Sequence, residues 1–150
     1  QVSDVNYRAM KPDDPGNIQK LSEGNAPAYR LTDAETFNKA TVTIVGEEGE
    51  QEFPYSQLAM STSVEMKGLK VVDVYTTKNE ESASKGAMTL TCKVGNQYIS
   101  VRTVVLYDEN GNLVTEDAYM GKTIDVKGIV DFFSDSYQIK VYSTNSITVH

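Results

Sequence analysis

Polar side chains that could hold a ligand gather on two neighbouring predicted strands in the second half of the chain. Apolar and polar residues alternate over Met88–Val94, and Gly95-Asn96 is a two-residue turn signal, so the next segment should return as an antiparallel partner. This alternation places on one outer face the side chains of Thr91, Lys93, Tyr98, Ser100 and Arg102. Lys140 and Tyr142, on a later strand, extend that face. Together these residues are the candidate ligand-binding surface.

The chemistry of this face suits a polymer, and it also suits an ordinary solvated sheet. An aromatic ring for stacking, cations and hydroxyls fit a single strand of nucleic acid, and they equally fit a sugar ring. Thr and Tyr are common on solvated sheet faces. The net charge of -7 weighs against nucleic acid, because contacts from Lys and Arg to phosphates dominate such binding. An oligosaccharide, single-stranded nucleic acid and a protein therefore all stay open as partners.

No group of residues in the sequence has the composition of a catalytic centre. The only histidine is the terminal His150, and a Ser-His-Asp or Cys-His arrangement would have to use it. The single cysteine, Cys92, falls on the apolar face of its strand, where a thiol is typically a small buried hydrophobe. Glu65 and Asp125 occupy equivalent places in two related strands and fit ordinary surface charges. We therefore expect that the protein is not an enzyme.

Two acidic segments have enough oxygen atoms to attract a cation. Asp108–Asn112 has oxygen side chains at alternate positions, but the sixth and twelfth places of an EF-hand loop, Gly and an acid, are Leu113 and Tyr119 here. A tight Asn-Gly turn accounts for this segment better. The glutamates within residues 47–52 are typical of a solvated turn. The sequence therefore predicts no metal site and no cofactor.

Two closely related phrases mark the strands that must position these side chains. Val64–Leu69 and Ile124–Ile129 each have an acid at the second place and Lys-Gly at the fourth and fifth. A glycine inside a strand is costly unless the backbone needs it. Gly68 and Gly128 therefore predict two long strands that bend sharply, as in the wall of a small β-barrel.

The expected strand order is a long bent strand, a hairpin, a connection, a second long bent strand and a final strand. Such an order is that of a five-stranded Greek-key barrel of the OB-fold type, so the fold class is mainly β. The connection Tyr107–Met120 contains Asn-Gly and predicts a hairpin or loop, where many proteins of this fold have a helix. The expected strands are Val64–Thr76, Met88–Val94, Tyr98–Leu106, Thr123–Phe133 and Tyr137–Ser143, with Ile147–Val149 at the end.

The closing half of the chain carries a resemblance to a known group of domains. Gly121–Phe133 followed by Tyr137–Val141 has a Gly, a V-x-V-x-G strand, a turn and a Y-Q-I-x-V strand. This pattern resembles OB-fold domains of secreted bacterial nucleases and surface lipoproteins, over residues 63–150. The resemblance implies an OB-fold-like barrel, in which the outer face of the second and third strands binds oligonucleotides or oligosaccharides.

The first 62 residues match no family pattern. Residues 1–29 predict a polar arm or linker, with one short helix near Ile18–Leu21. The capping-box pattern from Thr32 to Glu35 predicts a helix over Asp33–Lys39.

Two short strands are expected between this helix and the barrel. Thr41–Val45 is β-branched and predicts one of them. Glu52–Tyr55 predicts its partner, although Pro54–Met60 alternatively begins a helical turn. Because residues 30–62 are too few for a core of their own, we expect them to pack on the barrel, with the extra strands laid along it.

Localisation and function follow as expectations from these features. No stretch reaches the roughly 18–20 apolar residues of a membrane span. The chain starts at Gln1, which fits a removed leader and a secreted or cell-surface protein. We expect a non-catalytic extracellular or cell-surface binding module for a polymer or a protein partner. The alternatives are a single-stranded nucleic-acid-binding OB domain and a structural or assembly part of a larger surface protein.

Overall fold

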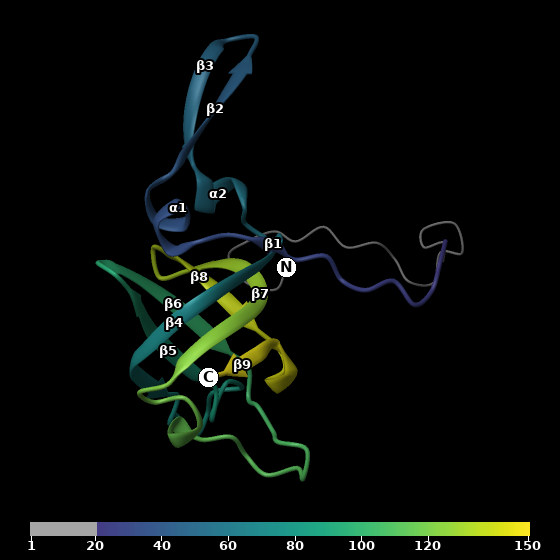
Figure 1. The fold of residues 1–150 in the computed structure, drawn as a ribbon, viewed down its shortest axis with the longest axis vertical. Coiled ribbons are helices and arrows are strands. Elements are labelled where there is room, and N and C mark those ends of the chain that lie inside the picture. Colours follow the sequence, from purple (N-terminus) through teal and green to yellow (C-terminus); the bar gives the residue numbers. More distant parts are fainter. Residues whose placement is uncertain (1–20) are drawn as a thin grey trace.

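A computed structural model describes residues 21–150 of the chain. Most of the predicted polar arm, and with it residues 18–20 of the predicted helix near Ile18, lies outside the described residues. Residues 21–29 form neither helix nor strand. The rest is mainly β, with a barrel, two short helices at one end of it and a hairpin that extends beyond them (Figure 1).

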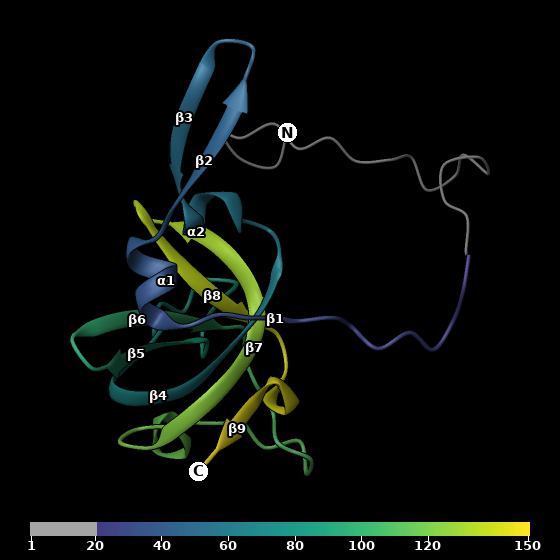
Figure 2. The ribbon, with the colours of Figure 1, turned by 45° about the horizontal axis from the view of Figure 1, so that its top comes forward.

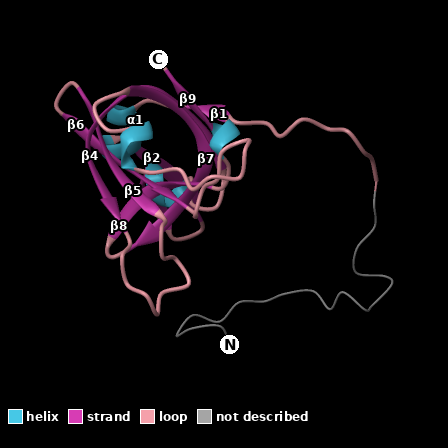
Figure 3. Cartoon of the chain, turned by 90° about the horizontal axis from the view of Figure 1, so that it is seen from below, coloured by secondary structure: helices cyan, strands magenta, loops and turns pink. Residues whose placement is uncertain are grey.

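The barrel is closed by five strands within the described chain. The strand order is β4-β5-β6-β8-β7, and β7 returns to pair with β4. The β6–β8 pairing is parallel, and the other four pairings are antiparallel. Figure 3 shows the strands wrapped around a common centre. This is the mainly β, OB-like barrel predicted from the sequence. Its strands are β4 (Ser63–Thr76), β5 (Met88–Val94), β6 (Gln97–Thr103), β7 (Thr123–Phe133) and β8 (Ser136–Val141).

The core of the barrel follows from the period-two alternation of its strands. Most inward residues of the barrel strands are aliphatic or Met, and removing them from water drives closure of the barrel. The alternation also turns the polar partners of these residues outward, which creates the candidate binding face. The fully buried side chains include Val64, Met66, Leu69, Val71, Met88, Leu90, Cys92, Val101, Ile124, Val126, Val130, Ile139 and Val141.

The two related phrases are direct neighbours, because β4 and β7 pair antiparallel with Val64 opposite Gly128. Gly68 has φ +68° and lies where the β4–β7 register shifts between Met66 and Leu69. Gly128 has no positive φ, but a Cβ there would lie 2.5 Å from the Lys140 carbonyl oxygen. The bend predicted at Gly68 is therefore a β-bulge, whereas Gly128 allows β7 and β8 to approach closely.

Short elements extend the barrel at its margins. β1 (Arg30–Leu31) pairs parallel with β4, and β9 (Ile147–Val149) pairs antiparallel with β7. The connection after β6 is a loop, as the Asn-Gly signal indicates. It contains a single bridge between Tyr107 and Leu113 and the 3-10 helix η1 (Glu116–Ala118). A second 3-10 helix, η2 (Thr144–Ser146), precedes β9.

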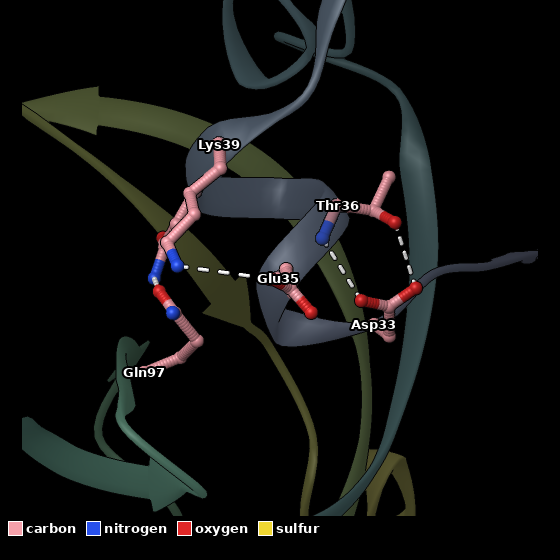
Figure 4. Close-up of polar contacts among 6 residues, drawn as sticks. Asp33, Glu35, Thr36, Lys39 and Gln97 are labelled. Atoms are coloured by element: carbon pink, nitrogen blue, oxygen red, sulfur yellow. Dashed lines mark hydrogen bonds and ion pairs between the residues drawn. The ribbon is translucent and has the colours of Figure 1, made fainter.

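The helix α1 (Ala34–Lys39) is capped by Asp33 rather than by Thr32, and it begins one residue later than expected. The Asp33 carboxylate accepts hydrogen bonds from the Thr36 N–H at 2.9 Å and the Thr36 hydroxyl at 2.7 Å (Figure 4). The backbone N–H of Thr36 is the main reason why the pKa of Asp33 lies below its ordinary value. Thr32 is buried, and among residues 21–150 its hydroxyl has no hydrogen-bond partner. The expected capping box is therefore replaced by an Asp cap one residue later.

The segment after α1 differs from the sequence expectation. β2 (Thr41–Gly46) and β3 (Gly49–Pro54) form the predicted pair of strands. The helix α2 (Tyr55–Leu58) follows directly, so the segment after Glu52 is first a strand and then a helical turn, as the two alternatives had it. Within the described residues, β2 and β3 hydrogen bond only with each other and form a separate sheet. They extend away from the barrel instead of lying along it (Figure 2). The barrel closes through β4 and β7, and the edges that these strands still offer pair with β1 and β9.

Candidate ligand-binding groove

The structure brings the predicted surface residues onto three adjacent strands. Across β5 and β6, Thr91 lies opposite Ser100 and Lys93 lies opposite Tyr98. The parallel β6–β8 pairing then sets Arg102 beside Lys140. Tyr142 directly follows β8. The side chains at all of these positions face outward, and the buried residues between them face the core.

Two hollows open on this outer face. The larger has a volume of about 710 Å³ and is bounded by the β4–β5 loop, by β5, β6 and β8, and by the β7–β8 turn. Ser100, Arg102 and Lys140 line it. The smaller, about 400 Å³, is lined by Thr91, Tyr98 and again Ser100, with α1 on its far side. Because they share lining residues, we call the two hollows together the groove.

Two of the predicted residues contact the groove only through their neighbours. Lys93 and Tyr142 line neither hollow. The Lys93 ammonium lies 5.7 Å from the centre of the Tyr98 ring, and the Lys140 ammonium lies 5.7 Å from that of Tyr142. Each pair is a cation–π contact, which holds a lysine against an aromatic ring at the margin of the groove.

Arg102, which lines the larger hollow, is held in place by hydrogen bonds. Its guanidinium donates to the Thr89 hydroxyl at 3.0 Å and to the Thr77 hydroxyl at 2.9 Å. Among the described acids, none forms an ion pair with this guanidinium. The two threonines therefore fix the orientation of Arg102 without neutralising its charge. A guanidinium has five N–H donors, so some remain for a ligand oxygen.

Several groove residues lie outside the surface predicted from sequence. The Gln138 amide is buried beside the groove and donates to the Asp131 carboxylate at 3.0 Å, across the β7–β8 pair. Tyr75 and Phe133 line the larger hollow with 60% and 69% of their surfaces exposed. The alternation of β7 and β8 places Asp131 and Gln138 outward, but only the parallel β6–β8 pairing brings them into the same hollow as Arg102.

The lining of the larger hollow is rich in hydroxyl groups and poor in charge. Its charged members are Arg102, Lys140 and Asp131. Ser and Thr side chains come from the strands, from the β4–β5 loop and from the β7–β8 turn. These hydroxyl residues are Thr77, Ser82, Ser84, Thr89, Ser100, Thr103, Ser134 and Ser136. The hollow therefore offers many neutral donors and acceptors, flanked by aromatic rings.

The nucleophile and base candidates of the sequence do not meet in this groove. Cys92 is fully buried in the core, and burial raises the pKa of its thiol to about 12. The His150 imidazole instead lies 3.1 Å from the Asp125 carboxylate, near β9. The same Asp125 oxygen accepts the Gly68 N–H at 2.8 Å, and this bond is the main cause that lowers the pKa of Asp125. Asp125 therefore supports the bulge in β4.

In the acidic turn after β6, the Asp108 carboxylate is hydrogen bonded within the turn itself. The Asp108 carboxylate accepts the backbone N–H groups of Asn110 at 2.9 Å and Asn112 at 2.8 Å. The Asn112 N–H is the main reason why the pKa of Asp108 is lowered. In residues 21–150, no group of three or more His, Cys, Asp or Glu side chains is arranged to hold a metal ion.

The sequence matches no known protein-family profile, and a comparison with curated proteins gives no match. The OB-like architecture therefore rests on the strand order and on the parallel β6–β8 closure. The resemblance to domains of secreted nucleases and surface lipoproteins stays a prediction. In the described part of the chain, no helix has the length and apolar character needed to cross a membrane.

Proposed function

We propose that the chain is a non-catalytic extracellular or cell-surface module that binds an extended oligosaccharide in the groove. One observation carries this proposal. The larger hollow lies over the second and third strands of the barrel, β5 and β6, between the β4–β5 loop and the β7–β8 turn. These are the elements with which OB-folds bind oligosaccharides and oligonucleotides.

The lining favours a sugar polymer over a polyanion. Sugar hydroxyls both donate and accept, as do the Ser and Thr hydroxyls of the groove, and Gln138 and Arg102 add planar donors. The exposed rings of Tyr75 and Phe133 provide apolar faces for the C–H side of a sugar ring. A few polar groups that fix orientation beside aromatic surface are typical of a ligand site.

Single-stranded nucleic acid is the second candidate. The exposed Tyr98 ring beside the Lys93 ammonium could stack a base and contact its phosphate. Only Arg102 and Lys140 add positive charge inside the groove, and the whole chain has a net charge of -7. Because phosphate neutralisation dominates such affinities, this arrangement favours the sugar.

Calorimetric titration of the chain with a panel of soluble oligosaccharides tests the proposal. We expect at least one to bind, and we expect Arg102→Gln to weaken that binding on the order of tenfold, because charge-assisted hydrogen bonds are lost. The matched control is Lys93→Gln, which removes one positive charge from the same outer face but outside both hollows. We expect this control to bind within about twofold of the parent.

The opposite pattern would contradict the proposal. Equal binding by Arg102→Gln and the parent would remove the groove as the site. Fluorescence polarisation with labelled oligo-dT at low and moderate salt tests the second candidate. Binding that weakens steeply with salt, together with no response to any sugar, would favour single-stranded nucleic acid.

A further inference from the structure

The β2–β3 hairpin makes few contacts with the rest of the described chain. It extends from the helical end of the barrel (Figures 1 and 2), and every residue of β2 is exposed. Its apolar residues are exposed as well: Val42 by 38%, Ile44 by 44% and Val45 by 73%. An isolated two-stranded hairpin is marginally stable in water. A surface of this kind gains stability when further strands or another face cover it.

The two faces of the hairpin differ in chemistry. Val42 lies opposite Phe53 and Ile44 opposite Gln51, so one face is largely apolar. The other face pairs Thr43 with Glu52 and Val45 with Glu50. All of the charge within the two strands is therefore negative and belongs to β3.

The free edge of β2 has open backbone groups. The Tyr55 N–H donates to the Ala40 carbonyl at 2.8 Å, so that pair is hydrogen bonded at the base of the hairpin. Hydrogen-bonded and non-hydrogen-bonded pairs alternate along an antiparallel ladder. The N–H and C=O groups of Thr41, Thr43 and Val45 therefore point away from β3. Such an edge is a template for another strand.

Only one of the two edges of the hairpin is protected. By the same alternation, the outward positions of β3 are Glu50, Glu52 and Pro54. Proline lacks an N–H, and two β3 edges placed together would set glutamates against glutamates. β2 contains neither a charge nor a proline, and five of its six residues are β-branched. Proteins usually protect an exposed edge with such residues, and here that protection is missing.

We propose that β2 pairs with β2 of a second copy of this chain, antiparallel and centred on Thr43. In this register Thr43 faces Thr43 of the second copy, and Val42 faces its Ile44. The outward backbone groups of Thr41, Thr43 and Val45 then hydrogen bond across the two-fold axis. The result is one four-stranded sheet whose apolar face is continuous.

The charge distribution of the hairpin fits pairing with a second copy of the chain. The neutral β2 strands meet at the centre, and the acidic β3 strands lie at the two outer edges, where their glutamates stay apart. The contact involves a single short strand from each copy, which is much less than a standard interface of about 1,600 Å². The dimer is therefore weak, with a Kd in roughly the micromolar range or above. It is independent of the groove.

Sedimentation velocity of the 150-residue chain, from a few micromolar to about 1 mM, tests this proposal. We expect a reversible monomer–dimer equilibrium. Thr43→Lys should weaken dimerisation on the order of tenfold or more, because it sets two ammonium groups opposite each other across the axis. The new lysine also lies opposite Glu52 of its own hairpin, so the monomer is not destabilised. The matched control Gln51→Lys adds the same charge on β3, and we expect it to dimerise like the parent.

A charge-reversal mixture tests the register. Thr43→Glu alone should also be monomeric, and an equimolar mixture of Thr43→Lys and Thr43→Glu should recover dimers. A parent that is monomeric throughout the range would overturn the proposal. So would a Thr43→Lys variant that dimerises like the parent, or a parent that forms only larger aggregates. A mixture that stays monomeric would overturn the pairing centred on Thr43.

Discussion

Gly68 and Gly128 show how one residue type serves two physical purposes in related strands. Gly68 supplies a left-handed backbone conformation, with φ +68° and open space where a Cβ would lie. Gly128 is required because it has no Cβ: the Lys140 carbonyl oxygen and the Ile139 side chain occupy the space where a Cβ would lie. The Lys-Gly pair that the two phrases share therefore meets a different structural requirement in each strand.

Alanine and asparagine substitutions distinguish these constraints. Gly128→Ala should lower the free energy of unfolding by about 3 kcal/mol, because a backbone oxygen must move away from the new methyl group. Gly68→Ala should cost about 1 to 2 kcal/mol through backbone strain alone. Gly68→Asn should cost less than Gly68→Ala, since Asn tolerates this conformation, whereas Gly128→Asn should be the worst of the four. Urea denaturation monitored by circular dichroism measures each value. Equal costs for the two alanine variants would contradict this account.

At the scale of the element, α1 shows how a local signal can be displaced by one residue. Thr32 and Glu35 have the capping-box spacing, yet the backbone N–H of Thr32 donates to the Glu65 carbonyl of β4 at 2.9 Å. That bond continues the β1–β4 pairing and draws Thr32 into a buried position. Asp33 then caps the helix. The tertiary contact to β4 therefore overrides the local capping pattern.

The two neighbouring residues should respond in opposite ways to loss of the polar group. Asp33→Ala should lower Tm by a few degrees, because the first turn of α1 loses its cap. Thr32→Val should leave Tm unchanged or raise it, since it replaces a buried hydroxyl without a partner by a methyl group. Differential scanning calorimetry compares both with the parent. A loss of stability in Thr32→Val as large as that in Asp33→Ala would show that Thr32 is the true cap.

At the scale of the whole molecule, closure of the barrel decides which side chains meet. Arg102 on β6 and Lys140 on β8 become neighbours only through the parallel pairing that closes the ring. The same closure buries Cys92 on β5 completely. The thiol is therefore an internal reporter of whether the barrel is open.

We expect Cys92 to be unreactive toward the thiol reagent DTNB at about pH 8 in the folded protein. The reactive species is the thiolate, and burial both hides the sulfur and raises its pKa to about 12. Reaction should occur on unfolding in urea, and faster in Gly128→Ala than in the parent under native conditions. Rapid, complete modification of a protein that retains its native circular dichroism would contradict a closed barrel.

Much of the barrel could be predicted from the sequence because its signals are local. Alternation over β5 and β7 and the Gly95-Asn96 turn depend on neighbouring residues, and these elements begin and end as expected. The position of the β2–β3 hairpin could not be predicted in this way. Its strands were predicted, but the expected place along the barrel was wrong, because the sequence of an edge strand does not specify which strand it pairs with.

The sequence by itself determined that Thr91, Lys93, Tyr98, Ser100 and Arg102 share one outer face, since period-two alternation and a two-residue turn fix the facing of both strands. Only the tertiary structure decided that this face is hollowed. The β4–β5 loop, the β7–β8 turn and the β6–β8 pairing surround Arg102 from segments far apart in the chain. The physical reason is that such contacts form only when the barrel closes over its core, and local patterns do not specify which loops and turns then meet.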